Sequence, residues 1–362
     1  MTTEPVQRKL QFVFEKYGIR PAKNFTFSFF SMGNEVFFIR DTKNRRLVLK
    51  NCLKNRSAQM LASEIALVEH LNKNGCGAPV IVPGVKGEKF VEMDGDFFIM
   101  TKFMRGHMPS WNTHLKTWHY RESIKGLACY HRAASTLDPT IDTDRIKTCE
   151  YERTLEWTEN LARILKEDTS GRPSVAKMRT IIDAYVDIAK KLPETLPAAE
   201  AAKCETLMIH GDFHAFNVVY RFRRFHACYD FDFIRRDLKL FDILWTFGFA
   251  QRKFYYNKYG KKIWNDDFRP EADDARKIEI DSLRWFVRIY RKTWKLSKAE
   301  ILLIPGMQNA MALYNLRFFD LAHSEEECME HFGWYAWILK KREYMDGPCR
   351  EAALIVAAEA DE

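Results

Sequence analysis

The chain has 362 residues, a formal net charge of +8 and a hydrophobic content of 46%. This length can bury a large core and hold two lobes or domains, and the hydrophobic content is ordinary for a globular protein. No run of about 18 apolar residues occurs and residues 1–9 are polar, so the sequence predicts neither a membrane span nor a secretory signal.

Three strands joined by short polar turns are predicted at residues 25–30, 35–40 and 46–51. The first connection contains Ser31, Gly33 and Asn34, which form a hairpin with a single glycine. The backbone N–H groups of such a hairpin can cover nucleotide phosphates. The same residues fit a plain hairpin turn equally well, so both interpretations stay open.

Lys50 ends the third of these strands, and a helix follows in which Ile65, Val68 and Leu71 recur on one face. Glu64 is expected in the first turn of this helix and is the candidate partner of Lys50. A strand lysine before such a helix is typical of proteins that hold ATP phosphates with an ammonium group. The alternatives are an exposed lysine at a strand end and a glutamate placed in the first turn by the helix dipole.

Two further strands are predicted at residues 89–92 and 96–103, on either side of a hairpin with one glycine. The second strand runs into the segment where a hinge between two lobes would fall. Lys102 and Met104 are the candidates for contact with adenine, because backbone groups of a hinge can bind a base. The predicted lobes are residues 1–103, for nucleotide binding, and residues 104–362, for catalysis and acceptor binding.

Residues 110–205 are predicted to form a helical insertion in the larger lobe, with amphipathic segments near 120–137, 150–166 and 173–191. His131 shares a helical face with Ile124 and Leu127, which favours a packed histidine over a catalyst. More helices are predicted from residue 271 onward, with several tryptophans. Large aromatic residues at helical spacing are core residues more often than ligand contacts.

The most informative segment of the chain is His210-Gly211-Asp212-Phe213-His214-Ala215-Phe216-Asn217, which has the form H-x-D-x-x-x-x-N. Apolar runs lead into and out of it. In such a loop one carboxylate accepts the proton of an acceptor hydroxyl, while an asparagine oxygen binds magnesium. Asp212 is therefore the candidate catalytic base and Asn217 a candidate metal ligand. The alternative is that both are turn formers between two strands.

Asp230 follows Asn217 by thirteen positions, at the end of another predicted strand. Beside the loop, its carboxylate is the candidate that completes a magnesium site. The pattern indicates transfer of a phosphoryl group from ATP, with Mg²⁺, to a hydroxyl. Asp232 is interpreted either as a second metal ligand or as a buried hydrogen-bonding residue. His214 is interpreted either as a substrate contact or as a brace for the loop backbone.

Together these elements resemble the aminoglycoside phosphotransferase and choline kinase-like superfamily, within the protein-kinase-like fold, over most of residues 25–250. Residues 98–106 (FIMTKFMRG) and 126–134 (GLACYHRAA) are most similar to the spore-coat CotS-type kinase-like proteins. One departure is that Asp230-Phe231-Asp232 replaces the aspartate-aromatic-glutamate or D-F-G pattern that is common among relatives.

The resemblance implies an α+β fold of two lobes, a small lobe of antiparallel strands with a helix and a larger, mainly helical lobe. It implies that Asp242 supports the catalytic loop and that the acceptor pocket lies between this loop and the C-terminal helices, where Trp245 is of interest. The expected protein is an ATP- and Mg²⁺-dependent phosphotransferase that acts on a hydroxyl of a small molecule, such as a sugar or an amino alcohol.

Two alternatives within the superfamily remain, an inactive kinase-like scaffold associated with the spore coat and an aminoglycoside phosphotransferase. Aminoglycosides are polycations, for which an acidic pocket is expected. The chain is basic overall, and the compact acidic group of its C-terminal half is Asp266, Asp267, Glu271, Asp273 and Asp274. Other small hydroxyl compounds are therefore the favoured acceptors.

The net charge of +8 also admits a nucleic-acid or membrane-surface binder, with basic clusters at residues 43–54, 221–224 and 253–262. Eight excess charges over 362 residues is modest, so a solvated surface explains the clusters better. We expect neither nucleic acid nor membrane as a partner. The eight scattered cysteines, without C-x-x-C spacing, indicate a reduced cytoplasmic compartment and give no zinc signature.

Overall fold

The computed structural model describes residues 4–22, 26–28, 34–52, 57–111, 113–264 and 268–360. The chain divides into two compact units, Met1–Asp144 with His210–Arg236, and Arg145–Ile209 with Asp237–Glu362. These units are defined by their compactness, and the lobe boundary between residues 103 and 104 stays a prediction. The first unit holds all the described residues that were predicted to bind nucleotide or magnesium or to act as the base.

A five-stranded antiparallel sheet lies in the first unit, in the order β1-β2-β3-β5-β4. Its strands are β1 (Thr26–Ser28), β2 (Glu35–Arg40), β3 (Arg46–Asn51), β4 (Val91–Met93) and β5 (Asp96–Lys102). The strands predicted at residues 35–40 and 46–51 are confirmed at both ends. Along β3, Leu47 and Leu49 are buried in the core, whereas Lys50 alternates with them and belongs to the other face of the sheet.

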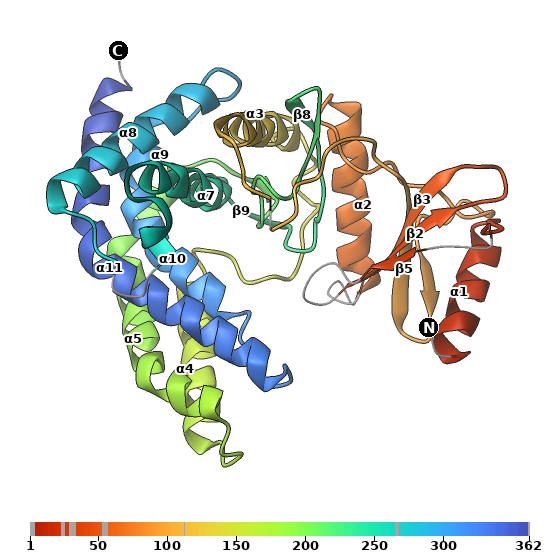
Figure 1. Ribbon diagram of the computed structural model, residues 1–362, viewed down its shortest axis with the longest axis horizontal. Helices are drawn as coiled ribbons and strands as arrows, with labels where there is room; N and C mark the ends of the chain where they lie inside the picture. Colours follow the sequence, from red (N-terminus) through yellow and green to blue (C-terminus); the bar gives the residue numbers. More distant parts are fainter. Residues whose placement is uncertain are drawn as a thin grey trace. The chain divides into compact units, whose positions relative to one another are not determined.

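Two helices cover the two faces of this sheet (Figure 1). Helix α1 (Glu4–Lys16) packs Leu10 and Val13 into the cluster that contains Leu49. Helix α2 (Ala58–Lys73) packs Leu61 and Ile65 into a second cluster on the opposite side. The sequence analysis did not anticipate α1, whose few apolar residues stand in a strongly polar segment.

Helix α2 begins earlier than the sequence analysis assumed. Ser57 caps it, and its hydroxyl accepts a hydrogen bond from the backbone N–H of Met60 at 3.1 Å. Glu64 therefore lies in the second turn, and its predicted place in the first turn is wrong. Because the effect of the helix dipole falls off within the first turn, it does not explain this glutamate.

The rest of the first unit consists of helix α3 (Thr117–Ala134) and a hairpin of β7 (Val218–Arg221) and β8 (Arg224–Cys228). His131 is fully buried on α3, as predicted for a packed histidine. Strand β8 lies directly against the loop that follows α2, where the backbone N–H of Cys228 donates to the carbonyl of Gly77 at 3.0 Å. A Cβ at Gly77 would lie 2.0 Å from the carbonyl oxygen of His226. The close approach of these two backbones therefore requires glycine.

The second unit is mainly helical. Its helices are α4 (Tyr151–Glu167), α5 (Pro173–Thr195), α6 (Ala198–Ala201), α7 (Leu240–Tyr259), the 3₁₀ helix η1 (Gly260–Trp264), α8 (Ala272–Tyr290), α9 (Lys298–Leu302), α10 (Ile304–Leu316) and α11 (Glu325–Glu359). Helix α4 packs on α5, and α8 packs on α11. The short strands β6 (Thr206–Ile209) and β9 (Arg235–Leu238) form a separate two-stranded sheet. Helices α3 to α6 fall in the segment predicted as a helical insertion.

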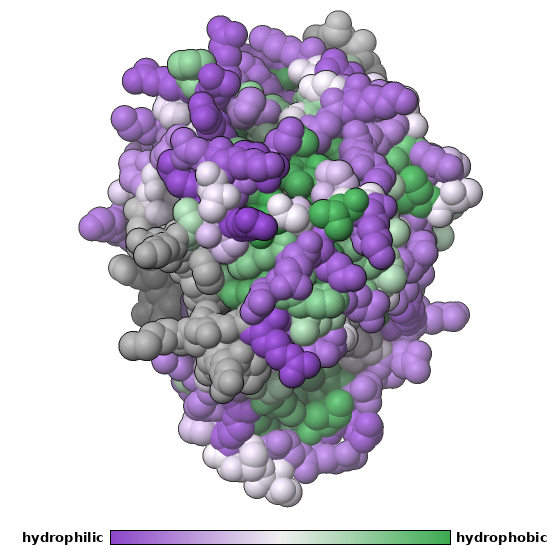
Figure 2. Space-filling model, turned by 90° about the vertical axis from the view of Figure 1, so that its right-hand side faces the viewer, coloured by the Kyte–Doolittle hydropathy of each residue, from purple (hydrophilic) through white to green (hydrophobic). Residues whose placement is uncertain are grey.

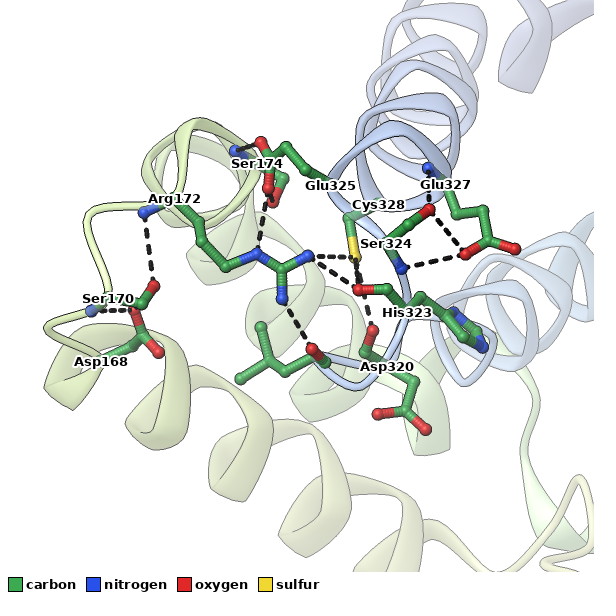
Figure 3. A network of polar contacts seen from close by, with 11 residues as sticks. Asp168, Ser170, Arg172, Ser174, Asp320, His323, Ser324, Glu325, Glu327 and Cys328 are labelled. Carbon is green, nitrogen blue, oxygen red and sulfur yellow. Dashed lines mark hydrogen bonds and ion pairs between the residues drawn. The ribbon is translucent and has the colours of Figure 1, made fainter.

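One guanidinium joins the start of α5 to the start of α11 (Figure 3). Arg172 donates to the carboxylate of Glu325 at 3.0 Å and to the carbonyl oxygens of Leu321 and His323 at 2.6 and 2.9 Å. Ser174 donates to the same carboxylate through its N–H, at 2.7 Å, and its hydroxyl, at 2.6 Å. The carbonyl groups of the loop before α11 thus find partners without a strand or helix to pair with.

Hydrophilic residues prevail on the face of the molecule in Figure 2, with hydrophobic residues between them. Within the described part of the chain, no helix combines the length and the apolar character that a bilayer crossing needs.

The two glycines Gly77 and Gly248 give a matched test of the fold. Gly77→Ala should destabilise the chain by about 1–3 kcal/mol, because the new methyl group meets backbone atoms that cannot move aside. Gly248 lies within α7, and a Cβ there meets nothing within 4 Å. Gly248→Ala should therefore stabilise it by about 0.5–1 kcal/mol. Urea unfolding measures both, and equal midpoints for the two variants would contradict the close approach at Gly77.

Candidate active site

The loop of residues 210–217 has a fixed backbone at its second residue. Gly211 has a φ of +79°, and a Cβ at this position would lie 2.3 Å from the carbonyl oxygen of Phe233. A side chain is excluded both by the left-handed backbone and by the neighbouring segment. This constraint sets the direction in which the chain enters Asp212.

The carboxylate of Asp212 is held from both sides by the loop itself. The Nε2 atom of His214 lies 3.3 Å from one carboxylate oxygen. The side-chain amide of Asn217 donates to the other oxygen at 2.9 Å and to the backbone carbonyl of Asp212 at 3.0 Å. Since the amide nitrogen donates in this way, the amide oxygen is the atom of Asn217 that a cation can use.

His214 reaches Asp212 in its neutral form. Its Nδ1 atom accepts a hydrogen bond from the backbone N–H of Phe216 at 3.2 Å, so the ring proton is on Nε2 and is directed to Asp212. The residue is 3% exposed, which leaves little surface for a substrate. Of the two interpretations made from the sequence, the structure favours the brace. The brace acts on the carboxylate of Asp212 as well as on the backbone.

Three hydrogen bonds tie the loop to the segment after β8. His210 donates from Nε2 to the carbonyl of Tyr229 at 3.0 Å, and the N–H of Tyr229 donates to the carbonyl of Asn217 at 3.1 Å. The Tyr229 hydroxyl donates to the carbonyl of Phe216 at 2.6 Å. Burial, followed by the nearby carboxylates, raises the pKa of Tyr229, so this hydroxyl keeps its proton. Because Tyr229 bonds to Asn217 and directly precedes Asp230, these bonds bring the segments of the two candidate metal ligands together.

Asp230 is half-buried and has a φ of +69°. Residues other than glycine seldom adopt this left-handed conformation, although aspartate tolerates it better than most. Such conformations persist where the surroundings fix them, and they cluster at functional sites. The bonds of Tyr229 on one side and the buried Phe231 and Asp232 on the other fix the backbone here.

Lys50 of β3 makes ion pairs with two carboxylates. Its Nζ atom lies 3.7 Å from Glu64, the predicted partner, and in direct contact with Asp232, which the sequence analysis did not connect to it. Burial opposes the charged form of Lys50, but the charges of Asp232 and then Glu64 outweigh it and hold its pKa well above the ordinary value. Lys50 therefore carries its positive charge at any physiological pH.

Asp232 is almost fully buried and accepts hydrogen bonds from Lys50 and from the side-chain amide of Asn34. This favours the interpretation as a buried hydrogen-bonding residue, with one partner on β3 and one directly before β2. Among the described residues, the amide oxygen of Asn34 is buried without a hydrogen-bond partner. Asn34 belongs to the segment interpreted either as a phosphate-covering hairpin or as a plain turn, of which Ser31 and Gly33 lie outside the described residues.

The predicted hinge is anchored at both ends. The backbone N–H of Lys102 donates to the carbonyl of Val80 at 2.9 Å, so this N–H already has a hydrogen-bond acceptor within the protein. Beyond Met104, His107 and Tyr220 exchange two backbone hydrogen bonds, at 2.7 and 2.8 Å, which link the segment to β7. Contact of Lys102 and Met104 with adenine stays a prediction.

The charge of this site fits a bound cation. Among the described residues, the carboxylates of Asp232 and Glu64 form ion pairs with the ammonium group of Lys50, and the charge of Asp230 also acts on it. Magnesium is commonly held by one or two protein oxygen ligands together with substrate phosphates and water. Asn217 and Asp230 stay the two predicted ligands of this kind. Among the described residues, no group of three or more His, Cys, Asp or Glu is placed to hold a metal ion.

Two residues of the second unit were predicted to assist the site. Asp242 is fully buried in the first turn of α7, and Trp245, one turn later, is half-buried with its ring 5.9 Å from that of Phe249. Support of the catalytic loop by Asp242 and contact of Trp245 with the acceptor stay predictions.

Comparison with known proteins gives one family and several relatives. Residues 27–286 match the model of the phosphotransferase enzyme family. The chain is 24% identical over 287 residues to a homoserine kinase of Phenylobacterium zucineum strain HLK1, over 78% of this chain and 74% of that one.

Two solved structures are similar over nearly their whole length. A microcompartment-associated aminopropanol kinase has a TM-score of 0.66 at 16% identity, with 94% of this chain and 98% of that chain covered. The amicoumacin kinase hAmiN in complex with AMP-PNP and Ca²⁺ has a TM-score of 0.64 at 16% identity, with 92% and 93% covered. These similarities confirm the predicted kinase-like α+β fold, whereas the similarity to the spore-coat subgroup stays a prediction.

The two carboxylates beside Lys50 differ in their effect on its protonation. Asp232→Asn should lower the pKa of Lys50, because it removes the nearest negative charge and leaves the burial in place. Glu64→Gln should lower it less, since that carboxylate is 3.7 Å away. The raised pKa means that the ion pairs stabilise the folded chain below about pH 10 and that this contribution is lost as the pH rises through the folded pKa.

The pH dependence of acetylation at Lys50, followed by mass spectrometry, measures this effect. Lys89, whose side chain is 51% exposed, is the internal reference. A larger shift in Glu64→Gln than in Asp232→Asn would contradict the order of the two contacts.

Proposed function

Because the chain belongs to the phosphotransferase enzyme family, we propose that it transfers the γ-phosphoryl group of ATP to the hydroxyl group of a small amino alcohol. The predicted enzyme class, a phosphotransferase with an alcohol group as acceptor, agrees with the family and with its kinase relatives. ATP, magnesium and the kind of acceptor belong to the proposal.

The held carboxylate of Asp212 is the observation that carries the proposal. His214 and Asn217 each direct an N–H group at one of its oxygens. These contacts fix the orientation of the carboxylate, to which the proposal assigns the proton of the incoming hydroxyl. A base placed in this way typically contributes a rate factor of about 10²–10⁴.

The proposed reaction is one displacement. The acceptor oxygen forms a bond to the γ-phosphorus as its proton passes to Asp212. The bond between the γ-phosphorus and the bridging oxygen breaks, and ADP leaves with the electron pair. Lys50, held by Asp232 and Glu64, binds the nucleotide phosphates. Asn217 and Asp230 hold magnesium, which when bound neutralises charge on these phosphates.

The relatives support an amino alcohol as acceptor. The names of the homoserine kinase and of the aminopropanol kinase both denote a short acceptor that carries a hydroxyl and an amino group. The carboxylate of Asp212 suits a positively charged acceptor better than a neutral sugar.

A panel of acceptors tests the proposal. ADP release is measured with ATP and magnesium for homoserine, ethanolamine, 1-amino-2-propanol, simple sugars and kanamycin. One of the amino alcohols should give the highest kcat/KM. A higher value for kanamycin than for every simple acceptor would favour an aminoglycoside phosphotransferase. Nucleotide binding without turnover of any acceptor would favour the inactive scaffold.

Substitution of the two aspartates separates the base from the metal ligand. Asp212→Asn should leave the affinity for Mg·ATP nearly unchanged and lower kcat by about 10²–10⁴, because it keeps the size of the side chain and removes its basicity. Asp230→Ala should weaken the binding of Mg·ATP itself. Asn217→Ala should weaken it less, since a neutral oxygen contributes less than a carboxylate.

Calorimetric titration with Mg·ATP and measurement of ADP release distinguish these effects. Binding of Mg·ATP by Asp230→Ala with the affinity of the parent, or nearly full turnover by Asp212→Asn, would show that the roles are assigned wrongly.

A further inference from the structure

An exposed tryptophan lies against the catalytic loop. Trp111 is 70% exposed, yet its ring centroid is only 4.5 Å from that of Phe216, at an interplanar angle of 33°. The same indole lies 5.4 Å from the ring of His214. One face of the indole thus packs on the loop, and much of its remaining surface is open to solvent. The sequence analysis did not single out this residue.

The structure holds both partners of this contact in place. Trp111 lies in a turn closed by two hydrogen bonds between Ser110 and Thr113, at 2.8 and 3.0 Å. Phe216 donates its N–H to His214 and accepts a hydrogen bond at its carbonyl from Tyr229. A large apolar surface that is both exposed and fixed is a common feature of binding sites, because little conformational entropy is lost when a ligand covers it.

His214 connects this indole to the catalytic base. Its ring lies beside Trp111, while its Nε2 atom lies 3.3 Å from the carboxylate of Asp212. The indole and the catalytic base thus contact the same imidazole ring. The imidazole between them is neutral, so it does not repel a positive group.

We propose that Trp111 forms the wall of the acceptor site that binds the ammonium group of an amino alcohol. This inference rests on the proposed function and names the residue that selects the acceptor. The face of an indole attracts cations through its quadrupole. The charge of Asp212, which contacts the same imidazole as the indole, favours the same sign.

Two acceptors that differ in charge test the proposal, 1-amino-2-propanol and the neutral 1,2-propanediol. Trp111→Leu should raise the KM and the calorimetric Kd for 1-amino-2-propanol by about 3- to 30-fold, because the cation–π attraction is lost. The values for 1,2-propanediol and the KM for ATP should stay within twofold. Trp111→Phe should retain most of the affinity, since a benzene ring also attracts cations.

Phe222→Leu is the matched control. Phe222 is another exposed aromatic residue of the same unit, 85% exposed at the turn between β7 and β8. Its replacement should leave the KM and Kd of both acceptors unchanged. An equal loss of affinity for the amine and the diol in Trp111→Leu would contradict the assignment of the ammonium group to Trp111. Unchanged KM and Kd for both acceptors would show that Trp111 is not part of the acceptor site.

Binding and turnover separate this inference from the proposed function. Calorimetry with a non-hydrolysable ATP analogue present needs no reaction. Binding of 1-amino-2-propanol that depends on Trp111, without ADP release from ATP, would contradict the proposed function and support the binding site. Turnover that does not change on substitution of Trp111 would support the proposed function and contradict the binding site. If the parent protein bound none of the ammonium-bearing acceptors, the inference would fall.

Discussion

The site depends on one backbone hydrogen bond, from the N–H of Tyr229 to the carbonyl of Asn217. It joins the end of the catalytic loop to the segment that carries Asp230, and the bonds of His210 and of the Tyr229 hydroxyl reinforce it on either side. The amide of Asn217 in turn holds Asp212. A single residue thus connects the proposed base with the proposed metal ligands, so displacement of Tyr229 would disturb both functions together.

The sequence predicted those parts of the site that lie close together along the chain. The loop spacing, the strand before Asp230 and the position of Lys50 follow from local patterns of polar and apolar residues. The contacts of Lys50 with Asp232 and of Asn34 with Asp232 join residues 182 and 198 positions apart. Such contacts are set by the packing of the sheet against the loop segment, on which a single sequence carries no direct information. The first turn of α2 was misplaced for a local reason, because the apolar repeat used to find the helix starts later than its serine cap.

The surplus of carboxylates around Lys50 explains why this group of residues is suited to ligand binding rather than to stability alone. A buried ion pair usually gains little over apolar packing, and an additional buried carboxylate costs free energy unless a cation joins it. The left-handed φ of Asp230 adds to this cost. Any ligand that binds the folded chain at this site would stabilise it by mass action.

The backbone contact at Gly77 also bears on how the first unit can move. The loop after α2 and strand β8 touch with no side chain between them, and the N–H of Cys228 donates to the carbonyl of Gly77 across the contact. Separation of the two segments would break this hydrogen bond and the backbone packing. Glu64 lies on α2 and Lys50 on β3, so a movement of α2 about this contact would change the distance between these two side chains. The contact of Lys50 with Asp232, which follows β8, would not depend on that movement.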